Sequence, residues 1–308
     1  MIFIENASDQ RTNDFFEGER NFQYISLAEK SAFLRILTII EILSNTGYKH
    51  LVIGGWDYVE FWVSSFISPQ NRNAVVVESS IFESATSGFK SIFKRVFLSR
   101  ISRVYASGKA QGAVAETLKF KREIIITKGV GIFNIVNQPN YIAVNQVTKF
   151  LYVGRLSPEK NLELLVNTFN ELPHLTLNII GFGPMEKQLK QIAKNNTFFL
   201  GSIPNNELYS YYQDNHVFIL PSLSEPWGIV VEEAFNNGIP VIVSNRVGCA
   251  PEIVKVDENG IIFDINDENS LRQSISKICD IKYYNFLRFN ISKLDFEKIA
   301  EAQVSSYI

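Results

Sequence analysis

Short apolar runs alternate with amphipathic segments and polar turns along the second half of the chain. Apolar runs bounded by Gly, Pro, Asn or Asp are typical of buried strands, and apolar residues at three- and four-residue spacing are typical of helices. The strands expected from this pattern cover 149–155, 175–181, 197–203, 217–220, 239–244 and 260–264. The helices expected between or after them cover 160–172, 185–195, 206–215, 229–237 and 266–278. Strands that alternate with helices predict an α/β fold with a parallel sheet.

The first half carries the same alternation less regularly, after a start at Ile2–Glu5 that is strand-like and then polar. Strands are expected at 50–56, 73–80, 103–108 and 123–127, and helices at 27–44, 57–67, 88–103 and 109–120. Residues 128–148 interrupt the pattern with Gly, Pro, Asn and Gln, as a linker does. The last segment, from about residue 284, is amphipathic and helical. We expect Asn266 or Asp267 to cap the helix before it.

Length and charge bound the possibilities. A chain of 308 residues accommodates two domains of about 150 residues each. The domains expected are 1–145, 146–285 and a C-terminal helix, 286–308, that packs back on the first domain. The net charge of −2 argues against a nucleic-acid partner. Residues 1–145 carry 16 Lys and Arg against 13 Asp and Glu, a balance of +3, so the first domain is the better candidate for an anionic surface.

The compartment expected is a reducing cytoplasm. The two cysteines, Cys249 and Cys279, lack the spacing of a metal site. The first 20 residues turn acidic and polar at once, unlike a secretory signal. We found no apolar run that approaches the roughly 18 residues of a membrane span.

Candidate chemistry lies where the strands of the second half end. Arg155 and Lys160 follow one strand, and an arginine with a lysine can neutralise a diphosphate. Glu225 follows another strand, and Glu233 lies about one turn into the next helix. Ligands of parallel sheets bind at the carboxyl ends of strands, beside helix N-termini that suit phosphate. Carboxylates there can accept hydrogen bonds from sugar or ribose hydroxyls. The alternative is that the glutamates are solvated surface charges.

The Gly181-Phe182-Gly183-Pro184 loop, with little side-chain bulk, adds a further piece at the same sheet edge. Two cations, glycine-rich backbone and two carboxylates at one edge describe a pocket for a nucleoside diphosphate sugar. At these residues the sequence resembles the retaining glycosyltransferases of family 4, which have the GT-B fold. The matching segments, in the family's order and spacing over roughly residues 149–264, are GRLSPEKN, IIGFGP, FLGSIPNNEL, PSLSEPWGIVVEEAFNNGIPVIVSN and GCAPEIV.

The resemblance implies two Rossmann-like domains facing a cleft, and a nucleoside diphosphate sugar as donor for a glycan or lipid-linked acceptor. It implies that Arg155 and Lys160 hold the diphosphate, Glu225 contacts the donor sugar, and Glu233 accepts hydrogen bonds from the ribose. It also implies no metal and no further cofactor, which fits the lack of a DxD triplet. The remaining donor-binding positions that the resemblance implies are Gly181 and Gly183, Ile203 near the base, and backbone N–H groups of Trp227, Gly228 and Ile229.

The first half departs from the family's pattern. The strand and glycine-rich loop that open many relatives have no counterpart here, so the first domain is expected to be shortened. Many relatives carry a histidine where this chain has Glu78, which either acts on the acceptor or is an ordinary strand-end carboxylate. The three histidines, His50, His174 and His216, precede strands, and we interpret them as structural.

The segment 88–103 combines an apolar stripe of Phe89, Ile92, Phe93, Val96 and Phe97 with flanking lysines and arginines. A stripe of this size is typical of a helix that packs on its own sheet, and we favour that arrangement, with the basic residues forming a rim near an anionic membrane. The alternative is an interfacial helix whose phenylalanines enter the lipid surface.

Two further functions compete with an active sugar transferase. One is a non-catalytic partner that binds a donor or acts as a scaffold for another transferase, which the short first domain leaves open. The other is a sugar-nucleotide epimerase of the GT-B fold. The GRLSPEKN segment and the Glu225–Glu233 spacing argue against the epimerase.

Overall fold

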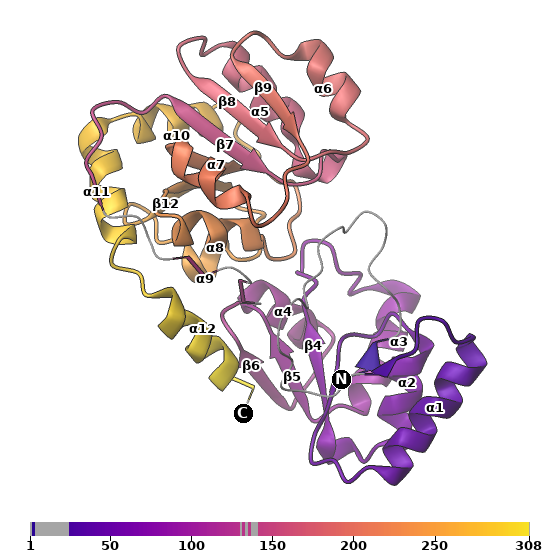
Figure 1. Cartoon of the computed structure of the whole chain (residues 1–308). Coiled ribbons are helices and arrows are strands. Elements are labelled where there is room, and N and C mark those ends of the chain that lie inside the picture. The colour runs from indigo at the N-terminus through magenta and orange to yellow at the C-terminus, as the bar shows by residue number, and fades with distance from the viewer. Residues whose placement is uncertain (1, 4–24, 130, 133–134, 137–140, 308) are drawn as a thin grey trace. The chain divides into compact units, whose positions relative to one another are not determined.

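The computed structural model of the chain describes residues 2–3, 25–129, 131–132, 135–136 and 141–307 (Figure 1). The chain divides into two compact units, and each is described on its own. Unit 1 comprises Met1–Glu78, Ala85–Ala106 and Gly112–Ile125, and unit 2 comprises Ser79–Ser84, Ser107–Gln111 and Ile126–Ile308. The domain boundaries expected at residues 145 and 285, and the packing of the last helix on the first domain, stay predictions.

Unit 2 is built on a six-stranded parallel sheet in the order β12-β11-β10-β7-β8-β9. Strands β7, β8 and β9 follow one another toward one edge of the sheet, and β10, β11 and β12 then extend it from the other side of β7 toward the opposite edge. This is the Rossmann order, in which the crevice between the first and fourth strands is the usual place for a ligand. The strands are β7 (Lys149–Val153), β8 (Thr176–Ile180), β9 (Thr197–Gly201), β10 (Val217–Leu220), β11 (Val241–Ser244) and β12 (Gly260–Phe263).

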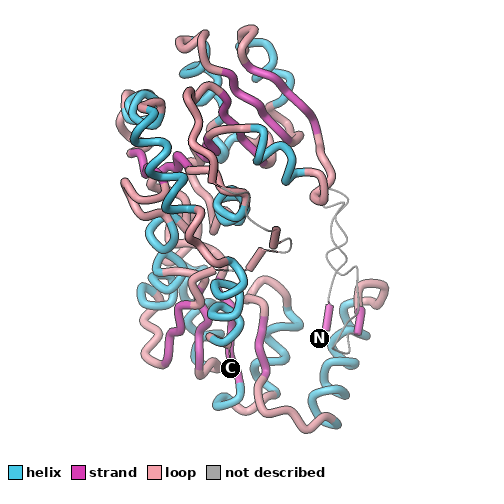
Figure 2. Tube along the Cα trace, turned by 60° about the vertical axis from the view of Figure 1, so that its left-hand side comes forward, coloured by secondary structure: helices cyan, strands magenta, loops and turns pink. Residues whose placement is uncertain are grey.

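Helices cover both faces of this sheet, because right-handed crossovers that run in opposite directions place their helices on opposite faces. Figure 1 shows α7 and α8 in front of the sheet and α5 behind it, and Figure 2 shows the helices in cyan and the strands in magenta from another side. The helices are α5 (Leu162–Asn170), α6 (Glu186–Ile192), α7 (Leu208–Asp214), α8 (Ile229–Asn236), α9 (Ala250–Ile253), α10 (Ser270–Ile278), α11 (Ile281–Ile291) and α12 (Phe296–Ser305). A short 3-10 turn, Pro158–Lys160, precedes α5.

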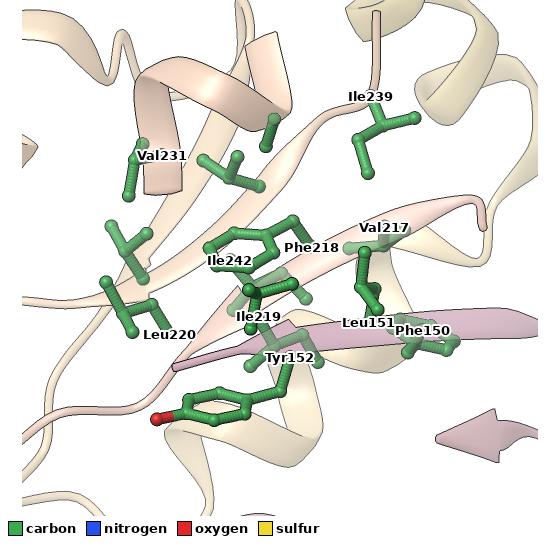
Figure 3. Close-up of a cluster of buried hydrophobic side chains, with 14 of the residues drawn as sticks. Phe150, Leu151, Tyr152, Val217, Phe218, Ile219, Leu220, Val231, Ile239 and Ile242 are labelled. Carbon is green, nitrogen blue, oxygen red and sulfur yellow. The ribbon is translucent and has the colours of Figure 1, made fainter. Parts of the chain in front are cut away.

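The core of unit 2 lies between these layers. Every residue of β10 and β11 is buried, as expected for central parallel strands that are covered on both faces. Figure 3 shows Phe218 and Ile219 of β10 packed between Tyr152 of β7 and Val231 of α8. The hydroxyl of Tyr152 points out of this cluster toward the carboxyl end of β7, where it donates to the carbonyl oxygen of Arg155 at 2.8 Å.

Unit 1 contains a four-stranded parallel sheet in the order β3-β4-β5-β6. Phe97 is fully buried in this unit, with the rings of Trp56 and Trp62 at 6.4 Å and 5.2 Å in edge-to-face contact. The strands are β3 (Leu51–Ile53), β4 (Asn73–Val77), β5 (Arg103–Ala106) and β6 (Glu123–Ile126), and a separate pair joins β1 (Ile2–Phe3) to β2 (Ile25–Ser26). The helices are α1 (Ala32–Asn45), α2 (Val59–Ile67), a 3-10 turn Gln70–Arg72, α3 (Gly88–Ser99) and, from Gly112 on, α4 (Lys109–Thr117).

The packing expected for the stripe on segment 88–103 is wrong for most of its residues. Only Phe97 is buried, whereas Phe89, Ile92, Phe93 and Val96 are 83%, 53%, 63% and 45% exposed. The side of α3 that faces the unit carries Ser91, Phe97 and Leu98. Trp56 packs beside α3. Its ring contacts Phe97, and the ammonium of Lys94 lies over the same ring at 4.8 Å from its centroid.

Three helix boundaries differ from the expected ones because of capping. Ser31 caps α1 by accepting from the backbone N–H of Leu34, so the helix starts at Ala32 and not near residue 27. The N-cap of α10 is Asn269, because Asp264 and Asp267 accept backbone N–H groups in the turns before it. The final segment is two helices, since Asp295 accepts from the N–H of Lys298 at 3.1 Å and starts α12 anew.

Candidate functional site

The loops that follow β7 and β8 lie against each other through their backbones. The N–H of Gly154 donates to Ile180 O at 3.0 Å, and the N–H of Leu156 donates to Phe182 O at 2.9 Å. A Cβ on Gly181 would lie 1.9 Å from Gly154 O, and a Cβ on Gly183 would lie 2.4 Å from Leu156 O. The two glycines therefore let the loop that carries Arg155 be held in place by the next loop. This is a structural reason for the glycines that the sequence did not indicate.

Gly183→Ala is expected to lower the free energy of unfolding by about 1–3 kcal/mol, the usual cost of overpacking a rigid site. The methyl group would meet main-chain atoms of Leu156, which cannot rotate away. Chemical denaturation measures this loss. Gly47→Ala is the matched control, because a Cβ on Gly47 would meet no atom within 4 Å. Equal stability of the two variants would contradict the steric explanation.

Lys160 and Glu225 form an ion pair at the switch point of the sheet. The ammonium Nζ of Lys160 donates to Oε2 of Glu225, and the two side chains are only 17% and 11% exposed. The N–H of Leu223 also donates to Glu159 O at 2.8 Å, so the loops after β7 and β10 are joined by backbone as well. The sequence placed both residues at this edge of the sheet. An ammonium keeps further donors free for a ligand's oxygens after it has bound one carboxylate.

The loop from Glu225 to Gly228 is fixed against the loop that follows β11. Glu225 N–H donates to Arg246 O at 3.1 Å, Gly248 N–H donates to Glu225 O at 2.9 Å, and Cys249 N–H donates to Trp227 O at 2.9 Å. Gly228 then adopts a left-handed conformation with φ 93° as the N-cap of α8. A side chain is strained in that conformation. The N–H of Val231 donates to Gly228 O at 2.9 Å, whereas the N–H groups of Ile229 and Val230 precede any acceptor within the helix. Such N–H groups at a helix start suit an anion.

Glu233 lies further along α8 and faces α7. Its Oε2 accepts the hydroxyl of Tyr212 at 3.0 Å. Burial raises the pKa of Glu233, and the charge of Glu232 adds to this rise, whereas the Tyr212 hydrogen bond opposes it. Burial, and then the carboxylate of Glu233, raise the pKa of Tyr212 well above its usual range, so its hydroxyl stays a donor.

Beside Glu233 is a cavity of about 340 Å³, within the usual range for small-molecule sites. It combines apolar and aromatic walls with amide and carboxylate groups, as a pocket for part of a nucleotide would. Its lining residues are Ile135, Val136, Asn205, Asn206, Leu208, Tyr209, Tyr212, Glu233 and Asn237.

The remaining residues singled out by the sequence lie as follows. Arg155 is exposed and makes no ion pair or hydrogen bond through its side chain within the described ranges. Ile203 is half-buried and packs against the core of unit 2, two residues before Asn205 of the cavity. Glu78 is an exposed residue that directly follows β4 in unit 1. His216 has a structural role, since its Nδ1 accepts the N–H groups of Thr148 and Lys149 at 3.0 Å and 3.1 Å.

Sequence reasoning missed the residues that support the carboxylates. Tyr212 carried no signal except its position in a helix, although a buried tyrosine usually finds a partner for its hydroxyl. Glu232, next to Glu233, is 3% exposed and accepts the indole N–H of Trp227. In the part of the chain that the structure describes, no three His, Cys, Asp or Glu side chains gather as ligands for a metal ion.

Comparison with known proteins bears on this geometry. The family model for "Glycosyl transferases group 1" matches residues 138–288, which include Lys160, Glu225 and Glu233. The chain contains a glycosyltransferase group 1 domain. The domain takes in β7 to β12 of the Rossmann sheet and the loops that carry the candidate site.

Two curated relatives are similar to this domain. The sulfoquinovosyl transferase SQD2 of Arabidopsis thaliana is 37% identical over 129 residues, which are 42% of this chain and 25% of the relative. The O-antigen biosynthesis glycosyltransferase WbnH of Escherichia coli is 34% identical over 140 residues, 45% of this chain and 39% of the relative. The matched region thus spans well under half the length of these relatives.

Solved structures extend the likeness to both units. The structure of Alr3699/HepE from Anabaena in complex with UDP and glucose has a TM-score of 0.71 with this chain, at 18% identity, and covers 92% of this chain and 86% of its own. Identity at this level shows the fold alone. The fold class expected from the sequence is confirmed, because the chain has two Rossmann-like units with parallel sheets, as in GT-B glycosyltransferases. The glycosyltransferase group 1 domain lies in unit 2.

Proposed function

We propose that this protein is a retaining, metal-independent glycosyltransferase of family 4, which transfers a hexosyl group from a nucleoside diphosphate sugar. The acceptor we propose is a cell-surface polysaccharide, a lipopolysaccharide or a lipid-linked glycan at the cytoplasmic face of the membrane. The observation that carries this proposal is the Lys160–Glu225 ion pair at the switch point, with Glu233 on the helix that starts beside it. The family match and the O-antigen relative support the reaction and the class of acceptor.

The phosphate end of the proposed donor site is cationic. Lys160 and Arg155 would hold the diphosphate, and the N–H groups of the first turn of α8 would add the partial positive charge of a helix end. Negative charge builds up on the diphosphate as it leaves the sugar, so preorganised positive groups there would lower the barrier. Glu225 keeps the ammonium of Lys160 in place before the donor arrives. This arrangement supplies phosphate neutralisation from the chain's own residues, which supports a reaction without a metal ion.

The sugar and ribose end would be formed by the two glutamates. Glu225 would accept hydrogen bonds from the donor sugar, whose other contacts are N–H groups of Trp227, Gly228 and Ile229. Glu233 would accept the ribose hydroxyls at the rim of the cavity, and the base would lie near Ile203 with Gly181 and Gly183 behind the phosphates. The position of Glu233 in the cavity wall supports this assignment.

The second candidate function is a non-catalytic partner that binds a nucleotide sugar for another transferase. It would use the same residues of unit 2, and it would differ only in having no acceptor chemistry. Binding alone therefore cannot separate the two candidates, and turnover must be measured.

A thermal-shift screen with UDP-, GDP-, ADP- and dTDP-sugars tests the donor class. A ligand that binds only the folded protein at 100 times its dissociation constant adds about 2.7 kcal/mol to the stability. We expect one base to give a clear rise in the melting temperature without added metal, and EDTA to leave that rise unchanged. No shift with any nucleotide sugar would contradict a donor site of either kind.

We propose that unit 1 makes a peripheral contact with an anionic membrane. Phe89 and Phe93 on α3 are the exposed tips of an apolar face, and Lys90 and Arg95 on the same helix are exposed cations. Aromatic side chains beside basic ones are typical of helices that lie in the lipid interface. None of the described helices is long and apolar enough to cross a bilayer.

Phe89→Asp combined with Phe93→Asp is expected to weaken vesicle binding at least roughly tenfold, because two aromatic side chains no longer enter the lipid and two negative charges are added beside an anionic surface. Pelleting with vesicles containing about one-third phosphatidylglycerol measures this. Phe198→Asp is the matched control, a side chain 48% exposed on β9 of unit 2. Equal pelleting of the double variant and the control would contradict the membrane contact.

A further inference from the structure

Glu232 is a buried carboxylate that the proposed donor site does not use. It directly precedes Glu233 on α8, so the two side chains point about 100° apart around the helix. Glu232 is 3% exposed, and its carboxylate forms no ion pair with a cation of the described chain. Burial raises its pKa, while hydrogen bonds from Trp227 and Gln303 act against that rise. A charged group buried without a cation lowers stability unless hydrogen bonds compensate, so its presence calls for a role.

The two oxygens of Glu232 hold different parts of unit 2. Oε1 accepts the indole N–H of Trp227 at 2.6 Å, and Oε2 accepts the Nε2 group of Gln303 on α12 at 3.2 Å. The same Nε2 group donates to Lys128 O at 3.0 Å. A Cβ on Gly129 would lie 2.0 Å from Nε2 of Gln303, so only a glycine leaves room for this arrangement. Glu232 thus connects the loop before α8 with α12 and with the segment after β6.

Trp227 is the part of that loop which Glu232 controls. The residue is 4% exposed, so its ring lies within the unit and the loop can offer a ligand only backbone groups at this position. The carbonyl of Trp227 is held by the N–H of Cys249 at 2.9 Å. The loop is therefore held at Trp227 by two hydrogen bonds, one from Cys249 to its backbone carbonyl and one from its indole to Glu232. A hydrogen bond to an ionised acceptor is about twice as strong as a neutral one, so the hydrogen bond from the indole of Trp227 to Glu232 holds the loop firmly.

We propose that Glu232 is a positioning residue for sugar transfer. Through the indole of Trp227 it fixes the loop between Glu225 and Gly228, so that Glu225 and the N–H groups before α8 meet the donor at the distance the reaction needs. The proposal rests on the proposed function and adds a role for a residue that touches neither donor nor acceptor. The alternative is a purely structural role, in which Glu232 stabilises the packing of α12 and has no effect on turnover of the folded protein.

The test compares three variants with the wild-type chain under saturating donor. Glu232→Leu removes the acceptor, Trp227→Phe removes the donor of the same hydrogen bond, and Glu232→Gln keeps an acceptor for the indole. Misplacing a reacting group slightly can cost up to about 100-fold in rate. We expect Glu232→Leu and Trp227→Phe each to lower kcat at least roughly tenfold with KM for the donor nearly unchanged, and Glu232→Gln to stay within about threefold of wild type.

Two further measurements separate positioning from stability. The indole ¹⁵N–¹H resonance assigned by its loss in Trp227→Phe should move in Glu232→Gln and move further in Glu232→Leu, whereas the other two indole resonances should not. Combining Glu232→Leu with Trp227→Phe should add no further loss of kcat, since both cut one connection. Gln303→Met, which leaves the indole bond intact, should lower the melting temperature and leave kcat near wild type.

The proposal is overturned by wild-type kcat in folded Trp227→Phe or Glu232→Leu, or by additive losses in the double variant. If Glu232→Leu fails to fold, Trp227→Phe and Glu232→Gln decide the matter alone. Failure of the proposed function gives a different result, because the wild type itself would then transfer no sugar from any donor.

Discussion

Lys160→Ala is expected to lower sugar transfer by roughly 100-fold or more, comparable to the loss of one preorganised donor at a site of developing charge. Lys160 is the cation that the fold brings to the switch point and holds there through Glu225. Without it, the leaving diphosphate would be stabilised only by Arg155 and by the start of α8. The measurement is kcat with saturating donor, since the effect belongs to the transition state more than to the bound donor.

The variant also leaves Glu225 partly buried without its cation, which can destabilise the fold. A double variant, Lys160→Met with Glu225→Gln, removes both charges and should restore stability without restoring turnover. Lys190→Ala is the matched control, because Lys190 pairs with Glu186 at 2.7 Å on the exposed surface of α6. Exposed pairs of this kind contribute about 0–1 kcal/mol, so stability and activity should stay near wild type. A Lys160→Ala protein that is folded and fully active would contradict the assignment of the phosphate end.

Glu233→Ala is expected to weaken binding of the nucleotide donor by roughly 10- to 100-fold. Hydrogen bonds to a charged group contribute about 1.5–3 kcal/mol, which corresponds to that range of dissociation constants. Isothermal titration calorimetry with the donor identified by the thermal-shift screen measures the change. Glu186→Ala, on the exposed surface of α6, provides the control and should bind the donor as wild type does.

The same site predicts a pH dependence of donor affinity. Ribose hydroxyls donate to the ionised carboxylate. Protonation of Glu233 removes its charge and turns one of its two oxygens into a donor, which weakens these hydrogen bonds. Burial raises the pKa of Glu233 above its usual value, so affinity should be full at higher pH and should fall as the pH drops through that raised pKa. Tyr212→Phe removes the hydrogen bond that opposes the rise. Its loss of affinity should therefore begin at a higher pH than in wild type, and an unshifted midpoint would contradict the role of Tyr212.

The effect of Glu232 and Glu233 on the pH dependence of folding stability is opposite to that of a carboxyl group whose pKa is lowered by folding. A carboxyl group whose pKa is higher in the folded protein than in the unfolded chain lowers stability when it is ionised in both states. This cost begins to decrease as the pH falls through the folded pKa, and it is gone below the pKa of the unfolded chain. Glu232 and Glu233 both belong to this class, because burial is the largest cause of each shift. Their presence in this chain despite that cost is in line with roles in binding and positioning.

The architecture of unit 2 followed from the sequence because its strands are short, apolar and separated by clear turn residues. Once the strands were assigned as parallel, Lys160 and Glu225 had to lie at one edge of the sheet, whatever the side chains did. What the pattern could not give was their direct ion pair, which depends on how far two loops lean toward each other. The hydrogen bond between Leu223 and Glu159 that joins these loops has no signature in residue type.

Other features escaped prediction because local patterns carry no information on distant partners. The glycines of the Gly181–Gly183 loop look like those of a phosphate cradle, but their immediate contact is with the loop of Arg155. Glu232 looks like an exposed helix charge until Trp227 and Gln303 are seen around it. On α3, most of the apolar stripe that we expected to be buried is exposed. Helical spacing predicts that an apolar stripe exists, but it does not show whether neighbouring elements cover that stripe.

The most direct test of the account is sugar transfer by the purified full chain from the donor selected by thermal shift, with extracted lipid-linked glycans as acceptor and EDTA present. We predict a product in which the anomeric configuration of the donor is retained, as read by NMR, and loss of this product in Lys160→Ala but not in Lys190→Ala. Tight binding of the donor without transfer or slow hydrolysis, in the presence of acceptor extract, would contradict an enzyme and would favour the non-catalytic partner instead.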